Sequence, residues 1–485
     1  MILAQSRPTI TRTMLSPVFL TSIWMAFANT VGPSTSTPRE KPRLCVLTDI
    51  SNEPDDEQSL IRLLLYANEI DIECLIATTG IHLKQTIAPE RIVRTVAAYG
   101  EVVGNLGAHA GGYPSAALLH SRIKSGNPGY GIKAVGPGLS SEGSKHLIHI
   151  VDSSDDRPVW VAAWGGANTL AQALFDVRRT RSRAAIDAFV AKIRVYAISD
   201  QDDAGPWLRK TFKNLYYVVS PSVVGGNHLE YYESAWSGIS GDRFYKNGPG
   251  IDLDLCENPW LRANVAENHG PLGALYPRVE YIMEGDTPSF LNLIANGLGA
   301  ERDPSFGGWG GRYVLRNTRG EDRPIYTHDR DTVTVGNNSY TSAQATIWRW
   351  RRAFQHDFAA RMDWSVQPER ARANHNPRPV VDGDASQTVV ETRAFAGTPV
   401  TVSARGSTDP DGDELRYRWF IYPEAGTLSR DKAPSIVLRG AGSPEVSFDA
   451  PSVTAPGALH LILEVSDSGS PSLYAYRRVI VNVFP

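Results

Sequence analysis

The sequence predicts an α/β fold, a mainly parallel sheet with helices on both faces, followed by a small all-β immunoglobulin-like sandwich. Two observations carry this prediction. In the first part of the chain, short apolar runs alternate with segments of helical periodicity. After Trp364 the helical periodicity ends and short alternating runs replace it. The length of 485 residues also exceeds what one hydrophobic core usually serves, so two domains are expected.

The first thirty residues differ in composition from the rest. Arg7 and Arg12 precede an apolar run at 14–28 that ends in small residues, which is typical of a signal peptide. We therefore expect residues 1–30 to be cleaved and the protein to be secreted, either extracellular or periplasmic in a bacterium. Residues 31–42 are rich in Pro, Ser and Thr and are expected to be a linker. No later segment is long enough to predict a membrane span.

Strand-like and helix-like segments then alternate in chain order. This alternation predicts a parallel sheet whose crossover helices cover both faces. In such sheets ligands bind outside the carboxyl ends of the strands. The expected elements are a strand at 43–48, a helix at 57–67, a strand at 70–77, a helix at 89–99, a strand at 158–163, a helix at 168–177 and a strand at 193–198.

The second half of the chain divides by composition. Residues from about 215 to 345 are irregular and rich in Gly, Pro and aromatic residues, which indicates long loops that build a binding cleft. Helical spacing returns at 343–362. We therefore expect one domain over 43–364, a linker over 365–379 and a β-sandwich over 380–485.

The charge balance and the aromatic content indicate which classes of binding partner to expect. Lys and Arg total 49, and Asp and Glu total 52. The chain therefore has no excess of positive charge that would predict binding to nucleic acid. The chain has 11 Trp and 19 Tyr, and aromatic faces stack on sugar rings.

Cys45 and Cys74 lie in apolar strands that could become neighbours, but two buried free thiols are the expected state.

An acidic cluster is the most informative segment. Asp49 follows the first strand, and Asp55 and Asp56 open the next helix. The helix dipole and free N–H groups explain one carboxylate at that helix start. Three carboxylates that converge repel one another unless a cation lies among them, and a hard divalent ion with oxygen ligands fits best. The sequence therefore predicts a metal site here.

The segment resembles the amino-terminal fingerprint of nucleoside hydrolases, in which a strand, an Asp and a short turn lead to Asp-Asp at a helix start. It departs from that family by two extra residues between Asp49 and Asp55, and by Leu47 where a further aspartate is usual. The segment 163–171 resembles a turn of the family whose backbone carbonyl binds calcium, and Asn168 occupies that place. An ordinary glycine turn in which Asn168 caps the next helix explains the same segment equally well.

A helical segment near the end of the first domain resembles the His-Asp pair that supplies the family's last aspartate ligand. This resemblance implies Asp357 as a calcium ligand, with His356 beside it at the substrate. The pair His328 and Asp329 is the alternative, but it lies in a polar stretch without helical periodicity.

The whole chain is similar to a secreted family described as cellulose-binding, which joins a nucleoside-hydrolase-like domain to a small carboxyl-terminal β domain. That resemblance covers nearly all of the mature chain. The segments that carry it are 198–207, 238–245, 285–290 and 358–364.

The resemblance implies a calcium-dependent glycosidase that hydrolyses N-glycosyl or related glycosidic bonds of a carbohydrate or nucleoside-like substrate. Asp49 would bind Ca²⁺ and accept a proton from the attacking water. Asp55 would hold sugar hydroxyls, while Asp56, Asn168 and Asp357 would complete the metal ligands.

Further site residues follow from their types. A proton donor for the leaving group is sought among His82, His228 and His356, although a lone histidine is more often structural. Side chains that could stack on a sugar are Trp207, Trp236 and Trp309.

A second function class stays open: a carbohydrate-binding protein that kept the fold and lost the reaction. Asp49, Asp55 and Asp56 favour the enzyme, whereas Leu47 favours the binder. In the carboxyl-terminal domain, residues 407–419 resemble polycystic-kidney-disease-type modules. Calcium binding at their acidic turn is the alternative to a hydrated turn, which is the expected state.

Overall fold

The computed structural model describes residues 40–220, 233–240, 252–318, 320–428 and 436–485. The predicted signal peptide at 1–30, the linker residues 31–39 and His228 lie outside these ranges. Glu40–Pro485 forms one compact unit. No helix within the described ranges is both long and apolar enough to cross a membrane.

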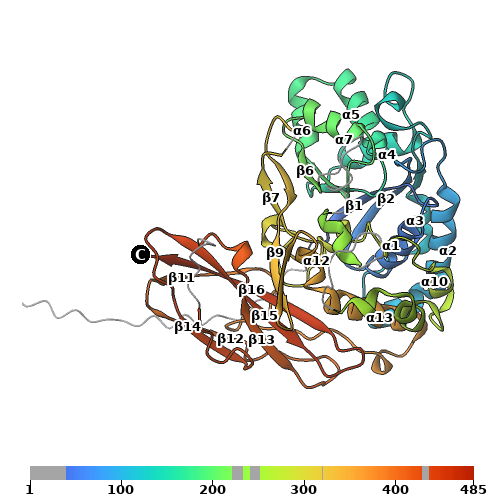
Figure 1. The fold of residues 1–485 in the computed structure, drawn as a ribbon. Helices are drawn as coiled ribbons and strands as arrows, with labels where there is room; N and C mark the ends of the chain where they lie inside the picture. The colour runs from blue at the N-terminus through green and yellow to red at the C-terminus, as the bar shows by residue number, and fades with distance from the viewer. Residues whose placement is uncertain (1–39, 221–232, 241–251, 319, 429–435) are drawn as a thin grey trace, which may run out of the picture. The chain divides into compact units, whose positions relative to one another are not determined.

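A mixed sheet of eight strands forms the centre of the first domain (Figure 1). Its strand order is β3-β2-β1-β4-β5-β6-β8-β7, and every neighbouring pair is parallel except β7 with β8. The strands are β1 (Arg43–Thr48), β2 (Asp71–Ala77), β3 (Ile123–Ser125), β4 (Val159–Ala163), β5 (Ile193–Ala197), β6 (Tyr216–Val219), β7 (Tyr313–Arg316) and β8 (Ile325–His328).

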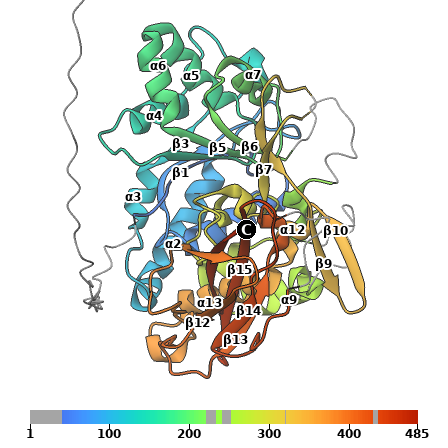
Figure 2. The same ribbon diagram turned by 90° about the vertical axis from the view of Figure 1, so that its left-hand side faces the viewer.

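Helices cover both faces of this sheet, as the sequence predicts. Figure 2 shows α4, α5, α6 and α7 on one side of the sheet and α2 and α13 on the other. The helices are α1 (Pro54–Leu65), α2 (Pro89–His109), α3 (Ala116–Ser121), α4 (Glu142–Val151), α5 (Asn168–Thr180), α6 (Arg183–Ala191), α7 (Ala204–Thr211), α9 (Asn258–Leu261), α10 (Gly270–Leu275), α11 (Pro288–Leu291), α12 (Ala345–Trp348) and α13 (Arg351–Val366).

The fully apolar sequence of β1 follows from burial on both faces. Successive side chains of a strand point to opposite faces. Leu44 and Val46 accordingly join the core beneath α1, α2 and α13, while Cys45 and Leu47 join the core beneath α4, α5 and α7. The first strand therefore serves two hydrophobic cores at once.

Cys45 and Cys74 form a disulfide, which corrects the expectation of two free thiols. Strands β1 and β2 are neighbours, and their register pairs Cys45 directly with Cys74. The two Cα atoms are 4.6 Å apart, within the range that a disulfide bridges. The sheet register decides which residues face each other across two parallel strands. The sequence of either strand alone does not reveal that register.

The carboxyl-terminal domain is a two-sheet β-sandwich, as predicted. Its four-stranded sheet has the order β11-β16-β15-β13, and β12 pairs with β14. Trp419 lies in the core between them. A separate hairpin, β9 (Asp331–Val335) with β10 (Asn338–Ser342), precedes α12. The sandwich strands are β11 (Val390–Phe395), β12 (Pro399–Ser403), β13 (Arg416–Ile421), β14 (Glu445–Asp449), β15 (Gly457–Ser466) and β16 (Tyr474–Phe484).

The β-sandwich shares a core with the first domain. Trp350, just before α13, packs edge-on against Tyr476 and Tyr422, with ring centroids 5.3 Å and 5.9 Å apart. All three side chains are buried in the same cluster as α1 and α2. Within the predicted linker at 365–379, His375 is 4% exposed, so part of this connection is packed into the protein.

Candidate active site

The turn after β1 delivers three carboxylates to the carboxyl edge of the sheet. Asp49 follows the strand directly, and α1 begins at Pro54, a residue suited to the first helical position because its missing N–H would be unpaired there. Asp55 and Asp56 then lie in the first turn, where the helix dipole favours negative charge. The hydroxyl of Thr48 donates a hydrogen bond to Asp56. All three aspartates are buried, with 3%, 9% and 5% exposure.

A fourth carboxylate, Asp286, completes the cluster from a distant part of the chain. One oxygen from each of Asp55, Asp56 and Asp286 lies within 4.8 Å of the other two. Asp286 is 3% exposed, and its Oδ2 has no hydrogen-bond partner among the described residues. A buried carboxylate oxygen without a donor is unfavourable, so this atom points to a cation among the three groups.

Helix α1 also holds the segment that carries Asp286. The guanidinium of Arg62 forms an ion pair of 2.7 Å with Glu284, and both side chains are fully buried. The Oε1 of Gln58 accepts a hydrogen bond from the Glu284 N–H at 3.0 Å, and Thr287 donates to Ser59 at 3.1 Å. The first turn of α1 therefore supplies the site carboxylates Asp55 and Asp56. Later residues of the same helix hold the segment that carries Asp286.

Glycines at two neighbouring strand ends leave room for Asp49. A Cβ atom at Gly80, after β2, would overlap the Asp49 carboxylate. A Cβ atom at Gly165, after β4, would lie 2.7 Å from Asp49 Oδ1, closer than such atoms approach in proteins. Both strand ends therefore form a cradle that only glycine permits.

Burial and mutual repulsion make these carboxylates hard to ionise. Burial, and secondarily the charges of neighbouring acids, raise the pKa of Asp49 to about 7 and that of Asp55 to about 8. The same causes raise the pKa of Asp56 and Asp286 well above the ordinary value. A divalent cation would offset this repulsion, and an all-carboxylate donor set suits a hard ion such as Ca²⁺.

Comparisons with known proteins agree with this architecture. Residues 43–313 match the family model described as "Cellulose-binding Sde182, nucleoside hydrolase-like domain". Residues 399–483 match the model described as "Cellulose-binding protein Sde0182, C-terminal domain". The chain belongs to this family. No curated protein matches the sequence.

Solved structures extend the comparison. The chain is similar to a nucleoside hydrolase-related hypothetical protein from Saccharophagus degradans that is associated with carbohydrate metabolism, at 38% identity and a TM-score of 0.75. That match covers 92% of this chain and all of the other. A PKD domain from the KIAA 1837 protein matches at 18% identity, 20% coverage of this chain, 82% of its own and a TM-score of 0.15, too low to support an argument.

Two predicted residues of the nucleoside hydrolase-like domain lie beside the cluster. A Cβ atom at Gly285 would lie 2.8 Å from Asp55 Oδ2 and 3.3 Å from the ring of Trp236, so these two side chains flank the same glycine. The exposed His82 is close enough to Glu53, at the start of the helix turn, to lower the pKa of that carboxyl, which burial raises.

Asp357 does not join the cluster, contrary to what the resemblance implies. Its Oδ1 accepts hydrogen bonds from Tyr66 at 2.5 Å and from Arg361 at 2.8 Å. Its Oδ2 accepts one from Asn376 at 2.8 Å. Both oxygens thus have donors, which come from the end of α1, from α13 itself and from the segment after α13. The carboxylate that meets Asp55 and Asp56 is Asp286.

His356 and Trp207 also lie elsewhere. His356 Nδ1 is 2.8 Å from the carbonyl oxygen of Ser472, and its ring packs on Tyr474 of the β-sandwich. Trp207 packs edge-on against Phe212, next to the core on the α5 and α7 side of the sheet. Neither contact involves the acidic cluster, so packing explains both side chains.

Asn168 connects strand ends to one another. Its Oδ1 accepts a hydrogen bond from Thr78 at 2.8 Å, and its Nδ2 donates to the Gly129 carbonyl at 2.7 Å. Its backbone N–H donates to Asp202 at 3.1 Å. The side chain is therefore committed to shaping the sheet edge. The backbone carbonyl of Asn168, the atom that the resemblance implies as a calcium ligand, stays a prediction.

The other candidate site residues that the sequence offers make structural contacts. Asp329 pairs with Arg312 at 2.8 Å, and Trp309 packs against Phe354 in the core. In the acidic turn of the second domain, Asp409 Oδ1 accepts the Asp411 N–H at 2.8 Å.

Asp286 is the functional candidate that sequence reasoning missed. It lies in a stretch without strand or helix periodicity, where no local rule selects one aspartate. The available signal was its place in the segment 285–290, which carries the resemblance to the family and opens α11.

Proposed function

We propose that this protein is a secreted calcium-dependent glycosidase of the nucleoside-hydrolase type that hydrolyses N-glycosyl or related glycosidic bonds of a carbohydrate. The observation that carries the proposal is the buried cluster of Asp49, Asp55, Asp56 and Asp286, whose fourth member has an unpaired oxygen. Such a cluster is a poor structural element on its own, because burial raises the pKa of every member and the charges of neighbouring acids raise it further.

The residues suit the roles that this chemistry requires. Ca²⁺ bound by Asp56 and Asp286 would polarise a water and grip sugar hydroxyls. Asp49, at the end of β1 beside these ligands, would accept a proton from the attacking water. Asp55 would hold sugar hydroxyls, and Trp236, on the other side of Gly285, would limit the space for the ring. Nearby negative charge would stabilise an oxocarbenium-like transition state.

The leaving group needs a proton donor, and we assign this role to His82. Among the candidates in the described residues, it is the one whose charge acts on the pKa of Glu53, which burial raises and His82 lowers, whereas His356 faces the β-sandwich. Its exposed position also suits exchange of protons with solvent.

Export and substrate class have separate support. The composition of residues 1–30 is that of a signal peptide, and the Cys45–Cys74 disulfide suits an oxidising compartment. The family description names cellulose, and the Saccharophagus degradans relative is associated with carbohydrate metabolism. A plant or microbial glycan is therefore the first substrate to test.

The test is a product-release assay on nucleosides, cello-oligosaccharides and other plant and microbial glycans, with and without Ca²⁺. We expect turnover by the wild type, which Asp49→Asn abolishes and removal of calcium by a chelator suppresses. Calorimetric titration should find a calcium site that Asp286→Asn weakens. Turnover unchanged in Asp49→Asn would refute the assignment.

A carbohydrate-binding protein without turnover is the second candidate. Leu47 stands where related hydrolases usually have an aspartate, and the family description speaks of binding. Glycan retention without product release, in the wild type and Asp49→Asn alike, would favour this function.

A further inference from the structure

Three segments meet at one end of the β-sandwich. They are the acidic turn at 409–413, the loop at 467–473 between β15 and β16, and residues 374–375 of the connection between the domains. Asn374 Nδ2 donates to Asp467 Oδ1 at 3.1 Å, and the His375 N–H donates to Asp411 at 2.8 Å. The connection therefore contacts the loop and the acidic turn at once.

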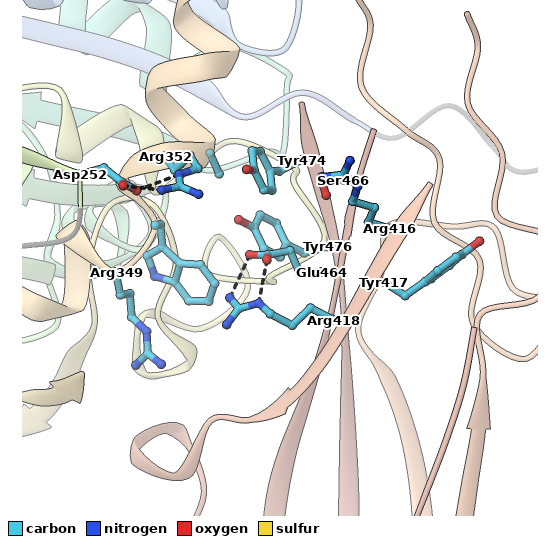
Figure 3. Close-up of a pocket in the computed structure, with 12 residues that line it drawn as sticks. Asp252, Arg349, Arg352, Arg416, Tyr417, Arg418, Glu464, Ser466, Tyr474 and Tyr476 are labelled. Atoms are coloured by element: carbon cyan, nitrogen blue, oxygen red, sulfur yellow. Dashed lines mark hydrogen bonds and ion pairs between the residues drawn. The ribbon is translucent and has the colours of Figure 1, made fainter. Parts of the chain in front are cut away.

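The loop is a short link between neighbouring strands. Strands β15 and β16 pair as far as Ser466 and Tyr474, which Figure 3 labels, so the loop begins directly at Asp467. The Oδ1 of Asp467 accepts two backbone N–H groups of the loop, at 2.9 Å and 3.0 Å, in addition to the amide of Asn374. Three donors on one oxygen fix the orientation of this carboxylate.

The second oxygen of Asp467 has no donor. The residue is 1% exposed, and its Oδ2 is buried without a hydrogen-bond partner among the described residues. Burial raises the pKa of Asp467 to about 6 against its three hydrogen bonds, which lower it, and the charge of Asp409 raises it further. A buried carboxylate oxygen without a donor is unfavourable, so Oδ2 calls for a partner that the protein itself does not supply.

Asp409 is divided in the same way. Its Oδ1 accepts the N–H groups of Asp411 and Asp413 at 2.8 Å and 3.1 Å, whereas its Oδ2 is buried without a partner in the described part of the chain. The two carboxylates are close enough for the charge of Asp409 to act on Asp467. Each is thus held through one oxygen, while the other oxygen has no donor.

The neighbouring acids already have partners. Asp411 accepts the N–H of His375, and the Nδ1 of the same histidine lies 3.0 Å from its carboxylate. Asp413 Oδ1 accepts the hydroxyl of Ser468, the residue after Asp467, at 3.2 Å. Asp409 and Asp467 are therefore the acids of this group whose Oδ2 atoms lack compensation.

The donor set indicates the kind of ligand. Two carboxylate oxygens supplemented by water suit a hard divalent cation, and Ca²⁺ accepts roughly six to eight oxygen ligands in irregular arrangements. A softer metal such as Zn²⁺ would seek nitrogen or sulfur. The one imidazole at hand, that of His375, is engaged by Asp411 on one side and lies 3.1 Å from His109 Nδ1 on the other.

We infer that Asp409 and Asp467 form a second calcium site, between the acidic turn and the loop. The ligand outside the turn, Asp467, distinguishes it from a site built by the turn alone. It shares no residue with the acidic cluster after β1 and does not depend on turnover there. Because Asn374 binds Asp467, the bound cation would also fix the connection between the domains to the β-sandwich.

The probe is Ca²⁺, titrated calorimetrically into the full mature chain. The wild type should bind two equivalents, and Asp286→Asn should keep the equivalent assigned here. Adding Asp467→Asn to that variant should weaken the remaining site at least roughly tenfold, because it removes one of two ligand charges. Asp409→Asn should do the same. Asp449→Asn is the matched control, since Asp449 pairs with Arg439 on the surface of the same domain.

The outcomes separate this site from the proposed metal centre. Loss of all calcium binding in Asp286→Asn would overturn the inference and leave the proposed function intact. Calcium binding that is lost in Asp467→Asn but unchanged in Asp286→Asn would support the inference and contradict the metal centre. A proton shared between Asp409 and Asp467 is the competing account, and it predicts that Asp467→Asn leaves calcium binding unchanged, which would overturn the inference.

Proteolysis gives a readout that does not depend on the calorimetric count. Arg372, in the connection, has a side chain that is 66% exposed and open to trypsin. In Asp286→Asn, Ca²⁺ should slow cleavage there at least several-fold, and adding Asp467→Asn should abolish the protection. Cleavage at the same rate with and without Ca²⁺ in Asp286→Asn would contradict the inferred attachment.

Discussion

Arg62 and Glu284 form a fully buried ion pair of 2.7 Å that joins helix α1 to the segment carrying Asp286. Tyr276 donates to Glu284 at 2.7 Å, and the Arg62 guanidinium lies 4.0 Å from the ring centroid of Phe358. The pair thus has partners on both sides. It links the stability of the fold to the geometry of the acidic cluster.

Removing one member of this pair should destabilise the protein strongly. In Arg62→Met, Glu284 would remain buried without its cation, so the free energy of unfolding should fall by about 3–5 kcal/mol. Urea unfolding measures this loss. The double variant Arg62→Met/Glu284→Gln should recover part of it, because the uncompensated charge is gone. A single variant as stable as the wild type would contradict this account.

Asp286 and Asp357 form a matched pair of substitutions. Asp286→Asn should weaken calcium affinity at least roughly tenfold, and should stabilise the calcium-free protein because it removes a repelling buried charge. Asp357→Asn should keep calcium affinity and lose about 1–3 kcal/mol of stability, since it weakens the contact with Arg361. Calorimetry and chemical denaturation distinguish the two. Reversed results would restore Asp357 as the ligand.

The glycine after β2 allows a steric test. In Gly80→Ala the new methyl group would overlap the Asp49 carboxylate, so Asp49 must move and turnover should fall sharply. Gly104→Ala is the control, because its methyl group meets no atom within 4 Å in α2 and should raise helix stability by up to about 1 kcal/mol. Equal turnover in both variants would exclude the proposed cradle.

His460 predicts a pH dependence of stability. Burial, and secondarily the charge of Arg478, lower the pKa of its imidazole from 6.5 to about 3. Between these two pKa values the unfolded chain binds a proton that the folded chain does not. The contribution of neutral His460 to the free energy of unfolding is therefore complete above about pH 6.5. Below that pH the free energy of unfolding decreases by up to about 1.4 kcal/mol for each pH unit.

The substitution His460→Gln tests this dependence. Glutamine keeps an acceptor for Arg478, which donates to His460 Nδ1 at 2.8 Å, but it does not titrate. Between pH 6.5 and 4.5 the free energy of unfolding should depend less steeply on pH in this variant. The decrease in slope should correspond to about one bound proton, or about 1.4 kcal/mol per pH unit. An unchanged slope would mean that another group takes up the proton.

Local sequence rules predict the parts of the fold that local physics decides. Alternating periodicities locate the strands and helices, and the strand-end rule brings Asp49, Asp55 and Asp56 to one sheet edge. The family confirms the α/β domain and the β domain. These predictions succeed because strand burial and helix starts depend on neighbouring residues in the sequence.

The parts of the site that sequence reasoning did not anticipate depend on contacts between distant segments. Asp286 lies in an irregular segment that is positioned through Arg62 and Gln58, and no periodicity reports such contacts. Asp357 has a local motif in its favour, but the packing of α13 gives its oxygens to Tyr66 and Arg361. Similarity of a short motif does not show which side chains of a helix point toward the site and which pack against neighbouring segments.

The shared aromatic core of Trp350, Tyr422 and Tyr476 has a consequence for how such proteins can be rebuilt. A boundary drawn between two modules normally invites shuffling, because each module keeps its own interior. Here a break within 365–379 would bare rings from both partners, so a transplanted β module would have to bring the same tyrosines to the same places. Inheritance as a pair is the expected evolutionary pattern.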